Sequence, residues 1–562
     1  MPRELGEADG LKLGKRDVMI IFIISAFFFL IAAFNLGQLN IPSTNWQVQP
    51  DSVTMNFDSN RTISTVYLLV NTDSNVTASF STPRGADWTA KAYMNNYGYY
   101  KWIEVPLNVK TDRLRIRFYT SAGDLFEVVA VDSNQEQVGI RSIKSDSGDA
   151  SVLRLVDEQS LFENPPSFRS ESFFDEDLFV RAAKEYLSLK EPVSEETHPP
   201  LGKLIIAASI DAFSFNPFSW RIMGVVFATM MIPVIYALGL ALFKTRAAAT
   251  IAASLLSLDF MHFSMSRVGT VDTYLVFFIL LSTLFFYLNY EKMSRGSGPD
   301  FRFILMGVIF FSLAFSVKWI AVFSLLGEAI LFLTIWMLGP SQSESLTERL
   351  NSLIKPLLVI TVIILIVGGG IYLASFIPYA LIGHSLYDIY NAQWSMLAYH
   401  TEMSAYTHQN SSNWWQWPTI LVPLWLYIKE LPGGMISIIS AMGNPVVWWT
   451  GLIAVISATV DGAKRKWPYL FLGILYFSQL LPYALISRYL FIYHYYAEVP
   501  ILCLAIAGLV HEMWYKPQQK KYVIILIVAT CIMFAIFYPV ISGYPIPQWY
   551  DSYLRWFRGW TF

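Results

Sequence analysis

The sequence predicts a polytopic α-helical membrane protein with an all-β domain inserted after its first membrane helix. Hydrophobic residues make up 54% of the 562 residues and charged residues only 15%, which is too little charge to cover a soluble protein of this length. Apolar runs long enough to cross a bilayer recur along the chain. Residues 44–165 instead contain short runs of β-branched and aromatic residues. The formal net charge of −2 argues against a nucleic-acid-binding protein.

A membrane helix needs roughly 20 apolar residues. About eleven segments meet this requirement. They are residues 18–38, 220–243, 247–265, 270–290, 302–319, 320–338, 354–377, 446–460, 468–486, 499–513 and 522–541. Residues 204–213 are also apolar, but this run is too short to span a bilayer, and we expect an interfacial or packed helix there.

The first apolar segment raises the question of a cleaved signal peptide, because basic residues precede it. Its run, VMIIFIISAFFFLIAAFNLG, is longer than the apolar region of a typical signal peptide and lacks a clear small-x-small cleavage site. We therefore interpret residues 18–38 as a retained anchor that follows a cytoplasmic N-terminus, residues 1–17.

Basic residues in the short loops predict the orientation. They all fall on one side if the N-terminus is cytoplasmic, and they are Lys12, Lys15, Arg16, Lys244, Arg246, Lys292, Arg295, Arg302, Arg349, Lys355, Lys464, Arg465, Lys466, Lys516, Lys520 and Lys521. The pieces placed outside the membrane are the β-domain 44–165, a loop 166–219, a loop 380–445 and the tail 542–562. Residues 220–379 then hold membrane helices 2–7, and residues 446–541 hold helices 8–11.

The β-domain is predicted from five runs: TISTVYLLV, NVTASFS, KWIEVPLNV, RLRIRFY and LFEVVAV. Gly, Asn, Asp and Ser separate them, which is typical of a sandwich of short strands. Roughly 120 residues can bury a core without disulfides, and the two cysteines, Cys503 and Cys531, lie in apolar runs elsewhere. The pattern resembles the galactose-binding, discoidin-type jelly rolls. We interpret the domain as a packing or spacer module, with contact to a glycan or acceptor as the alternative.

The loop 380–445 is rich in histidine and tryptophan. It contains His400, His408, Trp414, Trp415 and Trp417. One interpretation is an amphipathic helix with an aromatic belt at the membrane interface. The other is a lid over a site, in which aromatic rings stack on sugars and histidines hydrogen-bond a hydroxyl or a phosphate. Composition does not separate the two.

The segment FFDEDLFVRAAKEYLSLKEPVSEETHPPLGK, residues 173–203, concentrates charge next to the membrane. Asp175, Glu176 and Asp177 follow two phenylalanines, and a carboxylate in such a low-dielectric setting can act as a base near neutral pH. The alternative is a helix N-terminus, where acidic residues interact favourably with the helix dipole. Both can hold, since a first-turn side chain also points outward.

Cations cluster at the outer ends of the predicted helices. They are Lys203, Arg221, Arg267, Arg488 and, near the outer end of the fifth helix, Lys318. An ion beside hydrocarbon is costly and usually pairs with something. The partner is either internal, as for Arg267 with Asp272, or the lipid headgroups reached by snorkelling, or the phosphate of a lipid-linked sugar.

Several motifs together resemble the dolichyl-phosphate-mannose–protein mannosyltransferases, which belong to the GT-C membrane glycosyltransferases. In chain order they are FFDEDLF, HPPLGKL, WRIMGVVFATMMIPVIYALG, SMSRVGTVDTYLVFF, SVKW, YHTEMSAYTHQNSSNWWQWP, GNPVVWW and RYLFIYHYYAEVP. The resemblance covers about residues 173–500. It implies the GT-C fold and a glycosyltransferase activity.

The resemblance also implies a mechanism. A polyprenyl (dolichyl) monophosphate sugar would be the donor, and the hydroxyl of Ser or Thr on a secreted or surface protein would attack the anomeric carbon with inversion. Asp175 would be the base, with Glu176 beside it, and Arg221 would hold the donor phosphate. The other candidate donor-phosphate residues are Lys203, Arg267 and Arg488, and the candidate substrate-binding residues are His198, Lys318, His400, His408, Trp414 and Trp415. No cofactor or metal is expected.

Two departures from the family pattern indicate a prokaryotic, archaeal-type relative. The loop 380–445 is too short for the MIR repeats of the eukaryotic enzymes, and the β-domain is not part of their usual pattern. The acceptor is therefore open between a protein, a glycan and a lipid. A polytopic transporter is a further alternative, but the sequence contains no visible internal repeat and no paired broken helices with midplane charges.

Overall fold

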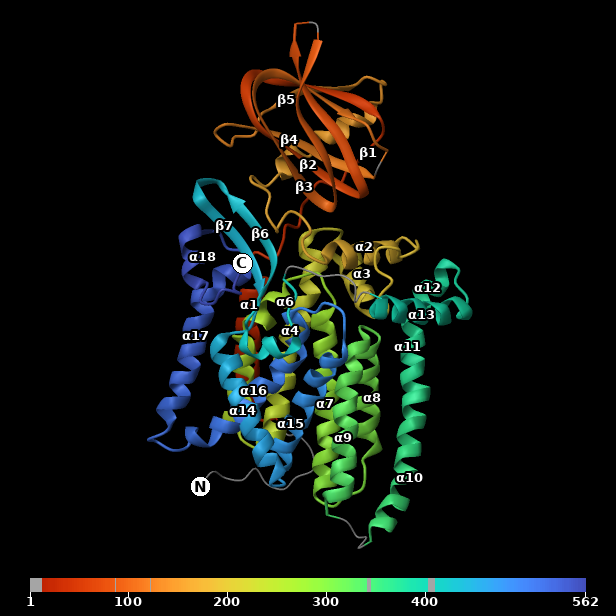
Figure 1. Cartoon of the computed structure of the whole chain (residues 1–562), viewed down its shortest axis with the longest axis vertical. Coiled ribbons are helices and arrows are strands. Elements are labelled where there is room, and N and C mark those ends of the chain that lie inside the picture. Colours follow the sequence, from red (N-terminus) through yellow and green to blue (C-terminus); the bar gives the residue numbers. More distant parts are fainter. Residues whose placement is uncertain (1–12, 86, 122, 341–344, 403–409, 562) are drawn as a thin grey trace. The chain divides into compact units, whose positions relative to one another are not determined.

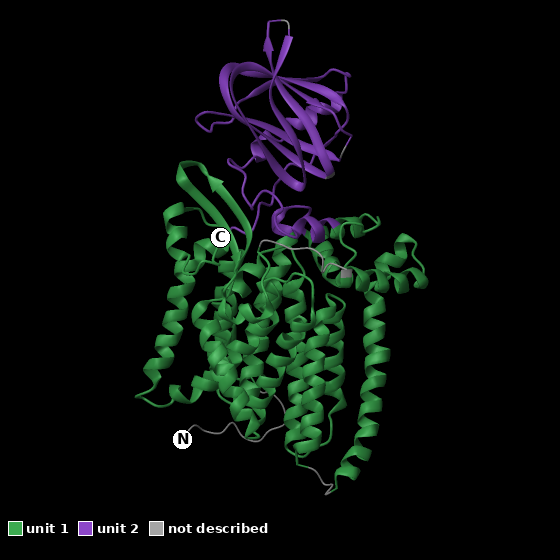
Figure 2. Cartoon of the chain, in the orientation of Figure 1, with its two compact units in different colours: residues 1–34, 182–212, 220–562 green, residues 35–181, 213–219 purple. Residues whose placement is uncertain are grey.

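The computed structural model describes residues 13–85, 87–121, 123–340, 345–402 and 410–561. The chain divides into two compact units (Figure 2). Unit 1 comprises residues 1–34, 182–212 and 220–562, and unit 2 comprises residues 35–181 and 213–219. The predicted β-domain, residues 44–165, lies within unit 2.

Unit 2 is an antiparallel β-sandwich (Figure 1). Its strands are β1 (Trp46–Gln47), β2 (Asp51–Arg84), β3 (Asp87–Phe118), β4 (Asp124–Asp132) and β5 (Ile140–Ser145). The two long strands bend at shifts in register and so contribute to both sheets. One sheet has the segment order 140–145, 51–57, 113–118, 76–84, 87–96, and the other has the order 46–47, 124–132, 61–72, 98–111.

The core of the sandwich follows from the alternation in its strands. Leu114, Ile116 and Phe118 are at most 2% exposed and join one cluster with residues from the other strands, such as Leu68 and Val128. Successive side chains of a strand point to opposite faces. The intervening arginines of RLRIRFY therefore lie on the outer face, and the predicted all-β domain is confirmed.

Unit 1 is built on long apolar helices. Nine in the described part of the chain are long and apolar enough to cross a membrane. They are α1 (Lys15–Ala33), α4 (Pro217–Phe243), α7 (Asp272–Ser294), Trp319–Leu338 containing α9 (Val322–Leu338), Leu346–Ser375 containing α10 (Leu346–Ile363) and α11 (Gly369–Ser375), α14 (Pro445–Ala463), Trp467–Leu485 containing α15 (Trp467–Leu480), Ile492–Trp514 containing α16 (Val499–Trp514), and α17 (Lys520–Ser542). Their positions confirm the predicted polytopic membrane fold.

Two further predicted segments are helical, but one helix is short and the other is bent. α8 (Phe301–Phe315) is apolar but has only 15 residues. The segment 247–265 forms a pair, α5 (Arg246–Ser257) and α6 (Phe260–Ser266), bent by 56°. At the bend, the Asp259 carboxylate accepts hydrogen bonds from the backbone N–H groups of Met261 and His262, which is the capping expected at a helix N-terminus.

The bend is also tied to α14. The indole Nε1 of Trp448 donates to Asp259 at 2.9 Å, and the backbone N–H of Asn444 donates to it at 3.2 Å. The Asn444 amide in turn donates to the carbonyls of Leu258 and Thr530. The GNPVVWW motif thus serves as a buried polar anchor, because a buried carboxylate needs several donors.

The segments of unit 1 that were predicted to lie outside the membrane contain short elements. They are the end of α2 (Glu176–Leu187), then α3 (Leu201–Phe213), α12 (Ile377–Ile382), α13 (Leu386–Glu402), β6 (Leu424–Leu431), β7 (Met435–Ala441), β8 (Ile546–Pro547) and α18 (Gln548–Leu554). Strands β6, β7 and β8 form a small antiparallel sheet that the sequence analysis did not predict. Gly433 and Gly434 form its turn with φ of 74° and 71°, values that favour glycine.

Candidate active site

A buried ionic cluster organises the segment before α3. The Lys203 ammonium donates to the Glu195 carboxylate at 2.6 Å, to the Glu195 carbonyl at 2.7 Å and to the His198 carbonyl at 2.8 Å. Both side chains are nearly inaccessible, Lys203 at 1% and Glu195 at 4%. An ammonium has three hydrogens, so the protein accepts all three. Lys203 therefore fixes the backbone of the HPPLGK motif.

Glu195 is the centre of this cluster. Its carboxylate also accepts from the backbone N–H and the hydroxyl of Thr197 and lies 2.8 Å from His198 Nδ1. Burial opposes ionisation, but Lys203 and His198 more than offset it, and the pKa of Glu195 lies well below its ordinary value. Burial lowers the pKa of His198, although Glu195 opposes this shift. We call Glu195, His198 and Lys203 the loop clamp.

His400 connects α13 to the loop clamp. Its Nε2–H donates to the Thr197 carbonyl at 3.0 Å, and its ring packs edge-on against His198 with centroids 5.4 Å apart. Burial and the neighbouring His198 lower the pKa of His400 to about 4. A neutral His400 therefore holds α13 next to the HPP motif. The other predicted histidine of this loop, His408, lies outside the described residues.

Lys318 pairs with an acidic residue inside the bundle. Its ammonium lies 2.8 Å from Asp272, and both side chains are 8% exposed. The internal pairing expected between Arg267 and Asp272 is therefore wrong in its cation, since Asp272 pairs with Lys318. The Lys318 ammonium also lies 5.7 Å from the centre of the Tyr493 ring, which stacks on His494 at 4.5 Å. The SVKW and YHYY motifs meet here.

Arg267 binds the carboxyl end of α1. Its guanidinium donates to the carbonyls of Ala32 at 2.6 Å and Phe34 at 2.7 Å, and more weakly to that of Ser542 at 3.4 Å. Arginine is well suited to the exposed carbonyls of a helix end. These contacts give Arg267 a structural task in unit 1.

Arg221 lies in the first turns of α4 and is fully buried. Its guanidinium lies 5.7 Å from the centre of the Trp220 ring. Three residues along α4, Gly224 faces the Ser266 carbonyl so closely that an added Cβ would lie 2.5 Å from it. Close packing of α4 against the turn after α6 thus brings two guanidinium groups into one region, which favours an anion there.

A polar pocket of about 230 Å³ opens between two loops of unit 1. Its lining includes Trp414, Trp415 and Arg488. The two loops are joined by a hydrogen bond of 2.8 Å from the Ser412 N–H to the Leu490 carbonyl. The pocket combines aromatic rings with a guanidinium, a set that suits a sugar bearing a negatively charged group.

Two buried residues support this pocket. Trp417 is inaccessible to solvent, donates its indole N–H to the Ser412 hydroxyl at 3.0 Å and packs edge-on against Tyr483. Tyr483 itself lines the pocket. The WWQWP motif is therefore divided, with Trp414 and Trp415 at the pocket and Trp417 in the packing beneath it.

The acid triplet lies in unit 2, at the start of α2. The Asp175 carbonyl accepts from the N–H groups of Leu178 and Phe179, as a residue at a helix N-cap does. The Asp175 side chain is half-buried, whereas Glu176 is inaccessible and its carboxylate accepts the N–H of Phe173 at 3.2 Å. The predicted helix start is confirmed, and it leaves a catalytic role of Asp175 open.

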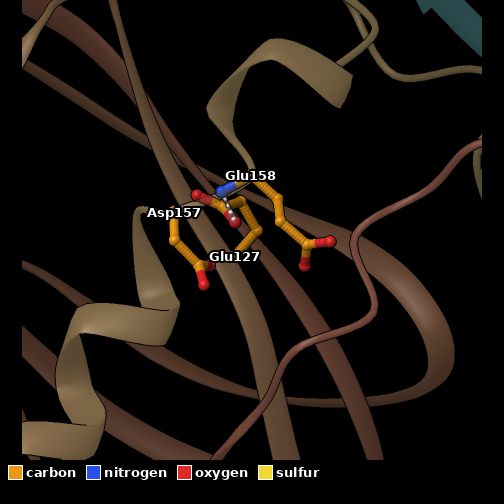
Figure 3. A group of neighbouring side chains, drawn as sticks. All are labelled: Glu127, Asp157 and Glu158. Atoms are coloured by element: carbon orange, nitrogen blue, oxygen red, sulfur yellow. Dashed lines mark hydrogen bonds between the residues drawn. The ribbon is translucent and has the colours of Figure 1, made fainter.

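A second group of acids in unit 2 was missed in the sequence (Figure 3). Carboxylate oxygens of Glu127, Asp157 and Glu158 lie within 4.8 Å of one another. Burial raises the pKa of Glu127 to about 8, so it is protonated at neutral pH. The Glu158 carboxylate accepts the backbone N–H groups of Ser43 and Thr44. These bonds attach the segment before β1 to the sandwich. Because Glu127 is neutral, the three carboxyl groups together form a poor cation site.

The structure thus brings some predicted residues together and leaves others apart. Lys203, His198 and His400 form one group, and Trp414, Trp415 and Arg488 line one pocket, both within unit 1. Sequence reasoning missed Glu195 and Tyr483. It named Asp272 and Trp417, but not the pairing of Asp272 with Lys318 or the packing of Trp417 against Tyr483. A signal for Glu195 was present, since it stands three residues before His198 in an acidic pair beside a lysine-containing motif.

Comparison with known proteins gives a consistent result. A family model described as dolichyl-phosphate-mannose-protein mannosyltransferase matches residues 167–382, and one described as the C-terminal four TMM region of protein-O-mannosyltransferase matches residues 385–560. The sandwich, residues 44–165, lies before both matches.

Curated relatives and a solved structure agree with these matches. The polyprenol-phosphate-mannose–protein mannosyltransferases of Corynebacterium glutamicum and Mycobacterium tuberculosis are 25% and 23% identical to this chain. Each alignment covers 65% of this chain, and they cover 81% and 80% of the relatives. The fold is similar to that of the S. cerevisiae Pmt1–Pmt2 complex bound to the sugar donor, with a TM-score of 0.59, 12% identity, and coverage of 69% of this chain and 89% of that one.

Proposed function

Because the chain belongs to the protein O-mannosyltransferase family of membrane glycosyltransferases, we propose that it transfers mannose from a polyprenyl (dolichyl) monophosphate to a Ser or Thr hydroxyl of a protein. The observation that carries this proposal is the order of the two family matches, which together span residues 167–382 and 385–560. The acid triplet, the loop clamp, Arg221 and the polar pocket all fall within these ranges.

In the proposed reaction, Asp175 is the general base. It removes the proton of the acceptor hydroxyl while the hydroxyl oxygen forms a bond to the anomeric carbon. The bond from that carbon to the phosphate oxygen breaks on the opposite face, which inverts the anomeric centre. A half-buried carboxylate at a helix start remains accessible to an acceptor, and general bases of this kind accelerate reactions by roughly 100- to 10,000-fold. The inaccessible Glu176 supports the turn that presents Asp175.

The donor phosphate is assigned to Arg221. A guanidinium neutralises the charge that develops on the departing phosphate, so the scheme requires no metal or cofactor. Trp414, Trp415 and Arg488 are assigned to the sugar and its charged linkage, on the basis of the pocket that they line. Lys203, His198 and His400 are assigned a positioning role. Lys203 and His400 donate hydrogen bonds to the backbone carbonyls of His198 and Thr197, and the His198 ring contacts the Glu195 carboxylate. Arg267 and Lys318 have internal partners and shape the bundle.

The runner-up is a related GT-C transfer to a hydroxyl of a glycan or a lipid. The additional sandwich favours keeping this alternative, because it lies outside both family matches and therefore outside the part of the chain that the relatives explain. The scheme also places the N-terminus in the cytoplasm and the sandwich and catalytic loops outside, on the evidence of the positive residues in the short loops.

One experiment tests substrate and orientation together. Sealed right-side-out vesicles containing the protein are loaded with radiolabelled dolichyl-phosphate-mannose in the membrane, and an impermeant Ser/Thr peptide is added outside. We expect a mannosylated peptide, which β-elimination releases as an O-linked sugar. Product that forms only after the vesicles are opened would contradict the orientation. Label that enters only glycan or lipid in opened vesicles would replace the protein acceptor by the runner-up.

A further inference from the structure

The outer face of the five-segment sheet in unit 2 carries a row of arginines. Arg113, Arg115 and Arg117 alternate with the buried Leu114 and Ile116 in the central segment of this sheet. Alternate residues of a strand share one face. The three guanidinium groups therefore project from the side of the sheet that is turned away from the sandwich core. We call this surface the arginine face.

Small polar residues lie beside the arginines on the paired segments. In the register, Arg115 pairs with Thr54 and Ser81, and Arg117 pairs with Ser52 and Ser79. On the next segment Lys144 pairs with Thr54. Short hydroxyl side chains leave the longer arginines standing above the sheet and provide additional hydrogen-bond donors and acceptors. The arginine face is thus a polar surface from which the guanidinium groups project.

Aromatic rings extend the arginine face. Arg115 lies 5.6 Å from the centre of the Trp88 ring, and Arg117 lies 5.4 Å from that of Tyr119. Tyr93, which pairs with Ser79, is 73% exposed, and Tyr119 is 46% exposed. Large aromatic rings left in water on a sheet face are available for stacking. Both guanidinium groups thus lie close to aromatic rings, an arrangement that favours cation–π contact.

The charge of the arginine face is positive within the described residues. Two carboxylates lie beside the row, Asp112 at 3.8 Å from Arg113 and Asp146 in contact with Arg115. Arg117 and Lys144 add charge and are both exposed. The face therefore presents more cations than these carboxylates neutralise, although the whole chain has a formal charge of −2. A local excess of this kind attracts anions.

We propose that the arginine face binds an acidic glycan, a chain of sugar rings that bear carboxylate or phosphate groups. Guanidinium groups in a row, two residues and roughly 7 Å apart along a strand, match anionic groups that repeat along an extended chain, and they form paired hydrogen bonds with carboxylates or phosphates. The exposed tyrosines provide surfaces for sugar rings. An acidic polypeptide would use the arginines but has no use for the tyrosines. A bilayer would favour long aliphatic side chains, whereas the described residues that share this face with the arginines include serines, threonines, a lysine and aromatic residues.

This inference goes beyond the proposed transfer reaction and is tested apart from it. Full-length protein in detergent micelles is titrated into fluorescein-labelled hexagalacturonate, and anisotropy gives the Kd. We expect saturable binding that weakens as salt is raised, because exposed charges are screened. The double variant Arg113→Gln/Arg117→Gln leaves the Arg115 ion pair intact and should raise the Kd about tenfold or more.

A matched control removes the same charge elsewhere in unit 2. Lys110→Gln/Arg154→Gln replaces two exposed cations, one in the segment that pairs with 61–72 and the other after β5. We expect it to change the Kd less than about twofold. Tyr93→Ser should weaken hexagalacturonate binding about threefold and leave binding of labelled hexaglutamate unchanged, since only a sugar ring stacks on tyrosine.

Each outcome decides the proposal. Absence of binding by the wild-type protein, or equal losses in the arginine and control double variants, would overturn the site. Hexaglutamate bound as tightly as hexagalacturonate would identify an acidic polypeptide instead, and binding only to nanodiscs with anionic lipid would identify a membrane surface. Mannosyl transfer by the arginine variant should be unchanged with a short peptide acceptor, so failure of the transfer assay and failure of this one are distinguishable.

Discussion

The two ends of the segment 173–203 both contain carboxylates, but the structure holds them differently. Glu195 is 4% exposed and accepts hydrogen bonds from Lys203 and from Thr197, with His198 beside it. Asp175 stands half-buried at the first turn of α2. A carboxylate held ionised by a buried lysine has a fixed charge and a fixed position. One that reaches solvent can exchange a proton with an incoming hydroxyl.

The contrast shows that carboxylates of one charged segment can differ in burial and in hydrogen-bond partners, so residue type alone does not assign a task to them. The two arginines are both buried. Arg267 binds the carbonyls at the end of α1, whereas Arg221 is proposed to hold the donor phosphate. The predictions for Asp175 and Arg221 each compare a residue proposed to act on substrate with a charged residue that is not assigned to the site.

The largest effect is expected for Asp175→Asn. Asparagine keeps the size and the hydrogen-bonding reach of the side chain but is not basic. Transfer of mannose should fall by about a hundredfold or more, the usual range for a positioned general base. Donor binding should persist, and the thermal midpoint should change little, because loss of charge at a helix start costs about 1 kcal/mol or less. Initial rates with dolichyl-phosphate-mannose and a peptide measure the effect.

The control for this prediction is Asp177→Asn in the same helical turn. Asp177 shares the helix-dipole interaction, and burial raises its pKa. If the triplet matters only as a helix start, the two variants should lose equally little activity. Full activity in Asp175→Asn would contradict its role as the general base.

The next effect concerns Arg221→Gln. Loss of one charge-assisted contact with the donor phosphate should weaken donor binding by roughly ten- to a hundredfold, and acceptor binding should be much less affected. The measurement is the Kd for the donor lipid in micelles. Arg246→Gln is the matched variant, since Arg246 pairs with Asp17 at 2.6 Å and is not assigned to the site. Equal donor affinities in the two variants would contradict the assignment.

Much of the fold could be predicted because membrane helices are determined by local composition. A run of apolar residues needs no knowledge of its neighbours to be recognised, and the predicted segments coincide with helices. The sandwich was recognisable for a similar reason, since alternation such as RLRIRFY encodes its own buried face. The bends at which β2 and β3 pass from one sheet to the other were not predictable, because register depends on partners far along the chain.

The candidate site was less accessible to sequence reasoning. The positions of the polar residues indicated where a site would lie, but not which cation would pair with which acid. Lys318 and Arg267 were both predicted near the outer ends of helices, and only the fold shows that Asp272, the first residue of α7, pairs with Lys318. Glu195 was overlooked because its role depends on a lysine eight residues later that folds back onto it.

The smallest effect on activity is expected for Glu195→Gln, in the loop clamp. Removal of one partner of a buried ion pair leaves the Lys203 ammonium uncompensated, which costs about 3–5 kcal/mol. The thermal midpoint should therefore fall by roughly several degrees, whereas transfer by the folded fraction should fall less than about tenfold. Glu191→Gln is the control, because Glu191 is 38% exposed in its pair with His384 and such pairs contribute little.

The pH dependence of the thermal midpoint sharpens this last prediction. The pKa of Glu195 in the folded protein lies well below its ordinary value, which is about 4.3 in an unfolded chain. The ionised carboxylate therefore contributes its full stability above about pH 4.5, and this contribution is lost as the pH falls through the lower folded pKa. The difference in midpoint between wild type and Glu195→Gln should be constant near neutral pH and shrink in acid.

Adding Lys203→Met to Glu195→Gln should restore part of the stability, because it removes the uncompensated ammonium. A pH-independent difference, together with no recovery in the double variant, would show that the loop clamp does not depend on this ion pair.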